Sequence, residues 1–132
     1  MPRITGILET ALYVDDLARS LDFYQTLFGF QVMVSIERMA ALEVPNSQVL
    51  LLFKKKGSLT GTPGGAHDGD GQLHMAFAIP AGEFDAWEAR LNELGIGITE
   101  KVTWDRGGRS LYFRDPDGHL IELATPGIWA NY

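Results

Sequence analysis

The apolar and polar positions along the chain follow one pattern that occurs twice. In the first half, residues 7–14 alternate in polarity, which predicts a strand. Apolar residues then recur at helical spacing across 17–28, which predicts a helix with Asp16 as its N-cap and Gly29 as its C-cap. The predicted strands that follow are 30–36, 38–44 and 49–53.

The second half repeats the same order. Residues 73–79 predict a strand, and apolar residues at steps of three and four across 84–94 predict a helix that Gly95 ends. The remaining predicted strands are 96–102, 109–114 and 119–124. The order βαβββ, written twice, predicts an α+β fold. We expect one domain over 1–132, made of module one (5–54), a loop or lid (55–72), module two (73–125) and a C-terminal tail (126–132).

Two segments lie outside the repeat. Residues 57–72 contain six glycines and few apolar side chains, so they form either a linker between the modules or a lid over a pocket. The tail carries the aromatics Trp129 and Tyr132, which could cap the core, cover a pocket or pack on a partner subunit.

The composition excludes several classes of function. The chain has 132 residues and no cysteine, so disulfides, thiolate zinc sites and cysteine nucleophiles are excluded. A net charge of −6 makes nucleic acid a poor partner, and the basic run 54–56 is interpreted as a solvated strand end. No apolar stretch reaches the roughly 20 residues of a membrane span, and no secretory signal is visible. We expect a cytoplasmic protein.

The repeat brings chemically active residues to equivalent positions. Superposing the halves pairs Glu9 with His74, and Leu51 with Glu122. Glu122 lies in an otherwise apolar strand, where a lone buried carboxylate costs several kcal/mol unless it is paired or ligates a cation. Glu9, His74 and Glu122 together predict a divalent metal site with one nitrogen and two oxygen donors and open positions for water or substrate.

Each of these three residues also has a structural interpretation. Glu122 could end a strand in water, His74 could be a core histidine bonded to a backbone carbonyl, and Glu9 could face solvent. Of the other histidines, His67 is interpreted as a solvated loop residue, although a lid histidine could reach a substrate. His119 follows the turn glycine and is interpreted as a surface residue at the start of a strand.

Two segments resemble the vicinal oxygen chelate superfamily, which includes glyoxalase I, extradiol dioxygenases, fosfomycin-resistance transferases, methylmalonyl-CoA epimerase and bleomycin-resistance proteins. They are Glu-Thr-Ala-Leu-Tyr-Val-Asp-Asp-Leu-Ala-Arg-Ser-Leu-Asp-Phe-Tyr (9–24) with Leu-Phe-Gly-Phe (27–30), and Arg-Asp-Pro-Asp-Gly-His-Leu-Ile-Glu-Leu (114–123). The resemblance implies two βαβββ modules whose sheets curl into a cup around a metal. It places the ligands at Glu9, His74 and Glu122.

The chain departs from this family's pattern at two of the four positions. The first position is often histidine in the superfamily and is Glu9 here; the fourth carries a glutamate in glyoxalase I-like members and is Leu51 here. Leucine can neither ligate a metal nor carry a proton, so glyoxalase I isomerisation is not expected. A site with two carboxylates favours manganese, magnesium, iron(II) or zinc.

The function expected from the resemblance is that of a metal-dependent enzyme, of dioxygenase, lyase, isomerase or transferase type, which chelates vicinal oxygens of a small substrate. Glu9 or Glu122 would hold the metal, and either could serve as a base. The candidate pocket residues are Tyr13, Arg38, Leu51, Trp104, Arg109 and Tyr112. The alternative is a metal-free protein of the bleomycin-resistance type that sequesters a small molecule. A homodimer is expected for either function.

Overall fold

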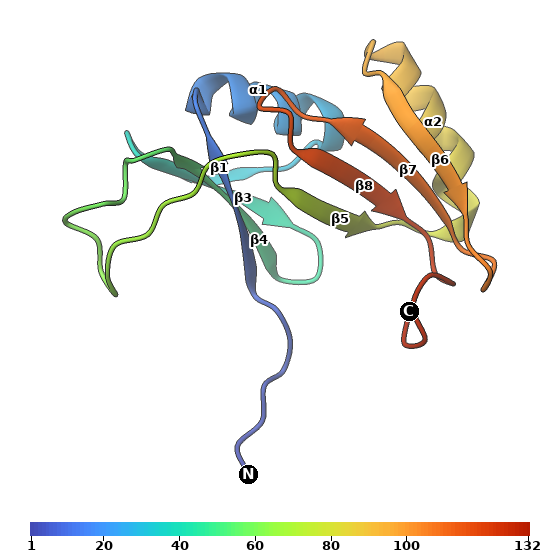
Figure 1. Ribbon diagram of the computed structural model, residues 1–132, viewed down its shortest axis with the longest axis horizontal. Helices are drawn as coiled ribbons and strands as arrows, with labels where there is room; N and C mark the ends of the chain where they lie inside the picture. Colours follow the sequence, from blue (N-terminus) through green and yellow to red (C-terminus); the bar gives the residue numbers. More distant parts are fainter. The chain divides into compact units, whose positions relative to one another are not determined.

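The computed structural model describes residues 1–132 as two compact units, 1–70 and 71–132. Each unit contains a four-stranded mixed sheet and one α-helix (Figure 1). The predicted α+β class and the two βαβββ modules are therefore confirmed. None of the helices is both long enough and apolar enough to cross a membrane.

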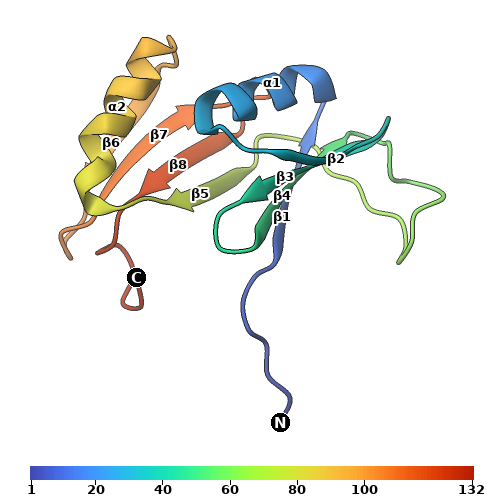
Figure 2. The same ribbon diagram turned by 180° about the vertical axis from the view of Figure 1, so that it is seen from behind.

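The first unit runs from the N-terminus through the glycine-rich loop. Its elements are β1 (Glu9–Val14), α1 (Leu17–Phe28), β2 (Val32–Ser35), β3 (Met39–Val44) and β4 (Gln48–Lys54). The sheet has the order β1-β4-β3-β2, with β1 and β4 parallel and the other pairs antiparallel. Figure 2 shows β2 at the outer edge of this sheet.

Helix α1 begins and ends where the sequence predicts. The Asp16 carboxylate accepts a hydrogen bond from the backbone N–H of Arg19 at 3.1 Å, a cap that contributes about 1 kcal/mol. Gly29 ends the helix in the left-handed region at φ 73°, and its N–H donates to the Gln25 carbonyl. The helix buries Tyr24 and Leu27 in the core of the unit.

Strand alternation divides the first sheet into a core face and an open face. Leu12 and Val14 of β1 are fully buried, whereas Ala11 and Tyr13, which alternate with them, are partly exposed. In β4, Leu50 and Leu52 are buried in the same way, and Leu51 is partly exposed. The open face is therefore the face of this unit that can receive a ligand.

The second unit has the same topology as the first. Its elements are β5 (His74–Ala78), η1 (Ala81–Glu83), α2 (Phe84–Glu93), β6 (Ile98–Thr103), β7 (Arg109–Arg114) and β8 (Leu120–Ala124). The sheet has the order β5-β8-β7-β6, with β5 and β8 parallel. Phe84 and Leu91 of α2 are buried, as are Leu111 of β7 and Leu123 of β8, which form part of the core.

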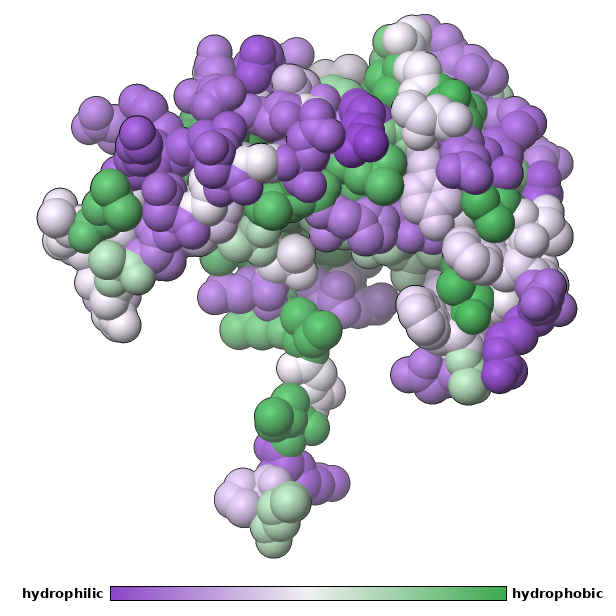
Figure 3. Space-filling view, in the orientation of Figure 1, coloured by the Kyte–Doolittle hydropathy of each residue, from purple (hydrophilic) through white to green (hydrophobic).

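The N-terminal segment 1–8 extends away from the first sheet without secondary structure (Figure 1). It carries hydrophobic residues in the open (Figure 3), and Ile4, Ile7 and Leu8 are 93%, 78% and 64% exposed. Single exposed apolar residues are common on proteins, but three within five positions give this segment an apolar surface available to a partner.

Candidate functional site

His74 and Glu122 lie together on the open face of the second sheet. His74 opens β5 in register with Leu120, and Glu122 lies two residues further along β8. Nε2 of His74 is 3.4 Å from Oε2 of Glu122. The His74 side chain is 51% exposed, whereas that of Glu122 is 10% exposed. A nearly buried carboxylate thus meets an accessible imidazole.

A hydrogen bond from the other ring nitrogen of His74 fixes the orientation and the tautomer of the imidazole. Nδ1 lies 2.9 Å from the Leu120 carbonyl oxygen. Because a carbonyl oxygen only accepts, Nδ1 holds a proton and donates it. In the neutral ring, Nε2 then directs a lone pair toward the Glu122 carboxylate, and this contact is favourable only with a proton or a cation between the two atoms. Metal-ligating histidines typically make the same backbone hydrogen bond through the ring nitrogen that does not bind metal.

The distance within this pair fits a shared divalent ion. Two donor atoms each about 2.1 Å from one tetrahedral ion are about 3.4 Å apart, which matches the observed separation. No cluster of three or more histidine, cysteine, aspartate or glutamate side chains is arranged for a metal. His74 and Glu122 are therefore the two donors that the second unit brings together, and Glu9 belongs to the first unit.

Tyr112 lies beside this pair. It is in register with Glu122 across β7 and β8, and its ring lies nearly parallel to that of His74, with the centroids 6.4 Å apart. Burial, together with the Glu122 carboxylate, raises the pKa of Tyr112 above its usual value of 10. The hydroxyl therefore keeps its proton to higher pH than an ordinary tyrosine, and it donates this proton to the Glu122 carboxylate.

Ser110 was not singled out from the sequence, yet it contacts the site directly. Its hydroxyl donates to Oε1 of Glu122 at 2.6 Å, and it accepts from the Trp104 indole N–H at 2.8 Å. The candidate pocket residue Trp104 is 37% exposed, and its indole Nε1 is directed toward Ser110. The available sequence signal was a serine two residues from Tyr112 in a strand, which places both on one face.

The first sheet contains the positions that are equivalent to those of His74 and Glu122. Ala11 pairs with Leu51 across β1 and β4, as Ala76 pairs with Glu122 across β5 and β8, so the register repeats between the units. Leu51 therefore holds the position that Glu122 holds in the second unit. Glu9 is the first residue of β1 and is exposed.

The glycine-rich loop folds over the open face of the first unit next to Tyr13. The Tyr13 hydroxyl and Nδ1 of His67 are hydrogen-bonded at 2.8 Å, and the His67 ring packs edge-on against Phe53 at 4.5 Å. A Cβ at Gly69 would lie 2.4 Å from the Tyr13 ring, so only glycine permits this close approach. The interpretation of His67 as a solvated residue is wrong, because its ring is part of this cluster.

Each of the two candidate arginines makes its contacts within its own unit. Arg38 belongs to the first unit, and its Nη1 donates to Ser58 Oγ at 2.9 Å. The Arg109 guanidinium stacks over the Phe84 ring of α2 at 3.7 Å and lies 3.5 Å from an Asp85 carboxylate oxygen. Arg109 therefore packs on the helix side of the second sheet, opposite Ser110 and Tyr112.

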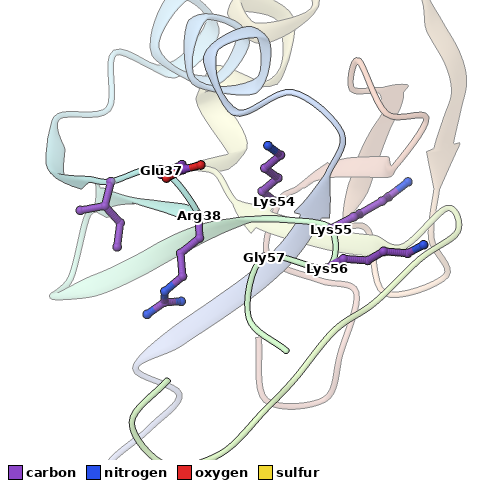
Figure 4. Close-up of a pocket in the computed structure, with 7 residues that line it drawn as sticks. Glu37, Arg38, Lys54, Lys55, Lys56 and Gly57 are labelled. Atoms are coloured by element: carbon purple, nitrogen blue, oxygen red, sulfur yellow. The ribbon is translucent and has the colours of Figure 1, made fainter. Parts of the chain in front are cut away.

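A basic pocket lies at the end of β4 in the first unit. It is lined by 36–38 and 54–57, but Arg38 points away from the lysines, and Lys54 points away from Lys55 and Lys56 (Figure 4). Lys55 forms ion pairs with Asp70 at 2.9 Å and Asp15 at 3.2 Å, and these raise its pKa. The pocket does not focus positive charge on a single point, in keeping with a solvated strand end.

His119 is buried, contrary to the expectation of a surface residue. It is 0% exposed, and its Nδ1 accepts a hydrogen bond from the Leu73 N–H at 2.9 Å. Its own N–H donates to the Asp115 carboxylate at 2.9 Å. Its position after the turn glycine suggested exposure, but the ring turns inward because it caps the backbone that leads into β5.

Comparison with known proteins identifies relatives along nearly the whole chain. The family model described as Glyoxalase/Bleomycin resistance protein/Dioxygenase superfamily matches residues 6–123. Metallothiol transferase FosB of Bacillus licheniformis is 30% identical over 128 residues, which cover 96% of this chain and 79% of that protein. Catechol-2,3-dioxygenase of Bacillus subtilis is 35% identical over 121 residues, which cover 90% of this chain and 41% of the dioxygenase.

The fold comparison agrees with these relatives. The crystal structure of lactoylglutathione lyase from Agrobacterium tumefaciens superposes with a TM-score of 0.91 at 30% identity, covering 98% of this chain and 99% of that one. The relatives are named as transferase, dioxygenase and lyase enzymes, which confirms the expectation of an enzyme of this kind. The chain belongs to the glyoxalase/bleomycin resistance protein/dioxygenase superfamily, also called the vicinal oxygen chelate superfamily.

Proposed function

We propose that this protein is a metal-dependent enzyme that binds a small substrate through vicinal oxygens at a divalent ion held by His74 and Glu122. The observation that carries the proposal is the 3.4 Å separation of Nε2 and Oε2, combined with the Nδ1 hydrogen bond to Leu120. This arrangement directs two donor atoms at one point and suits a metal better than a solvated surface pair.

Glu9 is the proposed third ligand. The sequence repeat supports this role, because Glu9 occupies the position that His74 occupies in the second half. It would join the pair from the same chain or from a second copy. A bound divalent ion would act as a Lewis acid that polarises the substrate's oxygens. Manganese, iron(II), zinc and magnesium all suit a donor set of one imidazole and two carboxylates.

The side chains around the pair indicate the chemical class of the substrate. The Tyr112 hydroxyl is hydrogen-bonded to the Glu122 carboxylate, and it would turn this hydrogen bond to a substrate oxygen bound beside Glu122. An oxygen-rich or anionic small molecule satisfies both this donor and a metal. The Tyr112 ring and the small side chains of Ala76 and Ala78 form an accessible apolar surface on the same face as His74 and Glu122.

Among the reactions of the named relatives, we favour transfer chemistry. An isomerisation that relies on a carboxylate at the fourth position lacks that group, because Leu51 stands there. This chain spans 79% of the relative named metallothiol transferase but only 41% of the dioxygenase. Transfer of a thiol to a small oxygen-rich substrate is therefore the first class of activity to assay.

A thermal-shift scan with Mn²⁺, Fe²⁺, Zn²⁺ and Mg²⁺ on chelator-stripped protein tests the proposal. A ligand at about 100 times its Kd stabilises the folded state by about 2.7 kcal/mol, which raises Tm by several degrees. His74→Ala should abolish the shift, and His67→Ala, which changes a histidine of the first unit, should keep it. An equal shift in wild type and His74→Ala would reject His74 as a ligand.

A metal-free binding protein is the second candidate. The direct contact of His74 with Glu122 favours it, because a protonated imidazole paired with the carboxylate would satisfy both groups without a metal. Leu51 at the fourth position favours it as well. Absence of any shift with all four ions in the wild-type protein would support this candidate over the enzyme.

We also propose that the protein acts as a homodimer. The exposed apolar residues of segment 1–8 and the 70% exposed Trp129 of the tail support this proposal. Light scattering coupled to size-exclusion chromatography should give twice the monomer mass of 14.6 kDa. A mass of one chain at micromolar concentration would refute it.

A further inference from the structure

Glu122 uses its two carboxylate oxygens for different contacts. Oε2 faces His74 Nε2, while Oε1 accepts the Ser110 hydroxyl at 2.6 Å. The side chain is nearly buried, so neither oxygen is freely solvated. The short distance of the second contact is typical of a charge-assisted hydrogen bond. One oxygen therefore anchors the side chain, and the other faces the His74 imidazole.

The direction of the hydrogen bonds behind Glu122 follows from the donor types. An indole N–H can only donate, so Trp104 Nε1 donates to Ser110 Oγ at 2.8 Å. The single hydroxyl proton of Ser110 is therefore committed to Glu122. Ser110 is 0% exposed, which excludes competition from water. The chain of donors runs in one direction, from Trp104 through Ser110 to Glu122.

The backbone turn that holds Trp104 is itself firmly fixed. The Trp104 N–H donates to the Gly108 carbonyl at 2.7 Å, and the Gly108 N–H donates to the Gly127 carbonyl at 3.0 Å. A Cβ at Gly108 would lie 2.5 Å from the Gly127 backbone, so the two glycine backbones touch. The tail, through Gly127, thus supports the turn that places the indole.

We propose that Trp104 and Ser110 are positioning residues that preset Glu122 for metal binding. This inference rests on the proposed metal-dependent function. With Oε1 anchored, Glu122 is held in one rotamer, and it offers a single oxygen beside the His74 nitrogen. Hydrogen-bond partners of metal ligands commonly change metal affinity by roughly 10- to 100-fold when removed. The indole N–H of Trp104 therefore orients Glu122 through Ser110, and only the exposed part of the Trp104 ring is available to a substrate.

Zn²⁺ titration of the chelator-stripped full-length chain, followed by calorimetry, tests this inference. Ser110→Ala should weaken the Kd for Zn²⁺ by roughly 10- to 100-fold. Trp104→Phe keeps an aromatic ring but removes the N–H, and it should weaken binding in the same direction by a smaller factor. Trp129→Phe, which changes an exposed tryptophan of the tail, should leave the Kd within twofold of wild type.

Two further readouts separate positioning from general stability. The Tm of the metal-free Trp104→Phe protein should stay near that of wild type while its Zn²⁺ affinity falls. Tryptophan emission should change on Zn²⁺ addition in wild type and Trp129→Phe, and this change should be lost in Trp104→Phe. Where Ser110→Ala fails to fold, Trp104→Phe alone carries the test.

The outcomes distinguish this inference from the function on which it rests. Tight Zn²⁺ binding by wild type with unchanged affinity in Ser110→Ala and Trp104→Phe would overturn the positioning role and leave the proposed metal site intact. Absence of Zn²⁺ binding by the wild-type protein would overturn both. Weakened binding in both variants, with Trp129→Phe unaffected, would support the positioning role.

Discussion

Nε2 of His74 lies 3.4 Å from Oε2 of Glu122, although the two residues are 48 positions apart in sequence (122 − 74). The parallel pairing of β5 with β8 brings them together, and the Leu120 carbonyl and the Ser110 hydroxyl orient them. The pair combines a nitrogen and an oxygen donor on one face of a sheet.

Leu51→Glu should tighten divalent metal binding if the repeat places Leu51 at the fourth ligand position. Leu51 is partly exposed on the open face, so a carboxylate there can be accommodated without burying a charge. The Kd for Zn²⁺ by calorimetry measures the effect, which we expect to be about tenfold or more. Gln48→Glu adds the same charge at the exposed start of β4 and should leave the Kd unchanged. Equal Kd values for both variants would refute the assignment of this position.

Gly69→Ala should release the loop from the open face of the first unit. The added Cβ would lie 2.4 Å from the Tyr13 ring, so the loop has to move. Limited proteolysis should then cut within residues 57–70 faster than in wild type. Gly82→Ala meets no atom within 4 Å and is the matched control. Equal cleavage rates would show that the loop does not depend on this contact.

The attachment of the same loop should weaken at high pH. Asp70 and Asp15 raise the pKa of Lys55 above 10.5, so the ammonium form favours the closed loop. A raised lysine pKa gives stability that is fully present below 10.5 and is lost as pH rises through the folded-state pKa. Protection of residues 57–70 from proteolysis should therefore hold from pH 7 to about pH 10 and fall above it, and Lys55→Gln should flatten this dependence. A loss of protection below pH 9 would contradict the assignment.

His119→Ala should destabilise the second unit. Removal of the ring leaves the Leu73 N–H without its acceptor, which costs about 1–3 kcal/mol before any cavity is counted. Urea unfolding measures the change in the free energy of unfolding. His67→Ala, a change in the first unit, should leave the unfolding of the second unit unaffected. A change below about 0.5 kcal/mol would mean that water replaces the ring.

Periodicity was sufficient to predict the elements of the fold. Alternation across residues 7–14 predicted strand β1, and the caps Asp16 and Gly29 marked the ends of α1, because both signals are local in sequence. The internal repeat also related Leu51 to Glu122, and the strand registers agree with this relation. The predicted strand 30–36 shortens to Val32–Ser35, since strand ends depend on pairing rather than on polarity.

The contacts that orient the candidate site could not be predicted from the sequence. His119 is buried because its ring receives the N–H of Leu73, a residue 46 positions away. Ser110 reaches Glu122 only through the pairing of β7 with β8. The glycine-rich composition of 57–72 left a linker and a lid equally open, and the structure shows the loop bound to Tyr13 through His67. Each of these contacts is set by tertiary structure.

The metal content of protein purified without chelators tests the central claim most directly. Elemental analysis should find about one equivalent of a divalent metal per chain in wild type and in Glu93→Gln, which removes an exposed carboxylate at the end of α2. Glu122→Gln should retain less than about a tenth of that amount, because an amide oxygen is a much weaker ligand than a carboxylate. Equal metal content in wild type and Glu122→Gln, or no divalent metal in any of the three proteins, would contradict a metal site at His74 and Glu122.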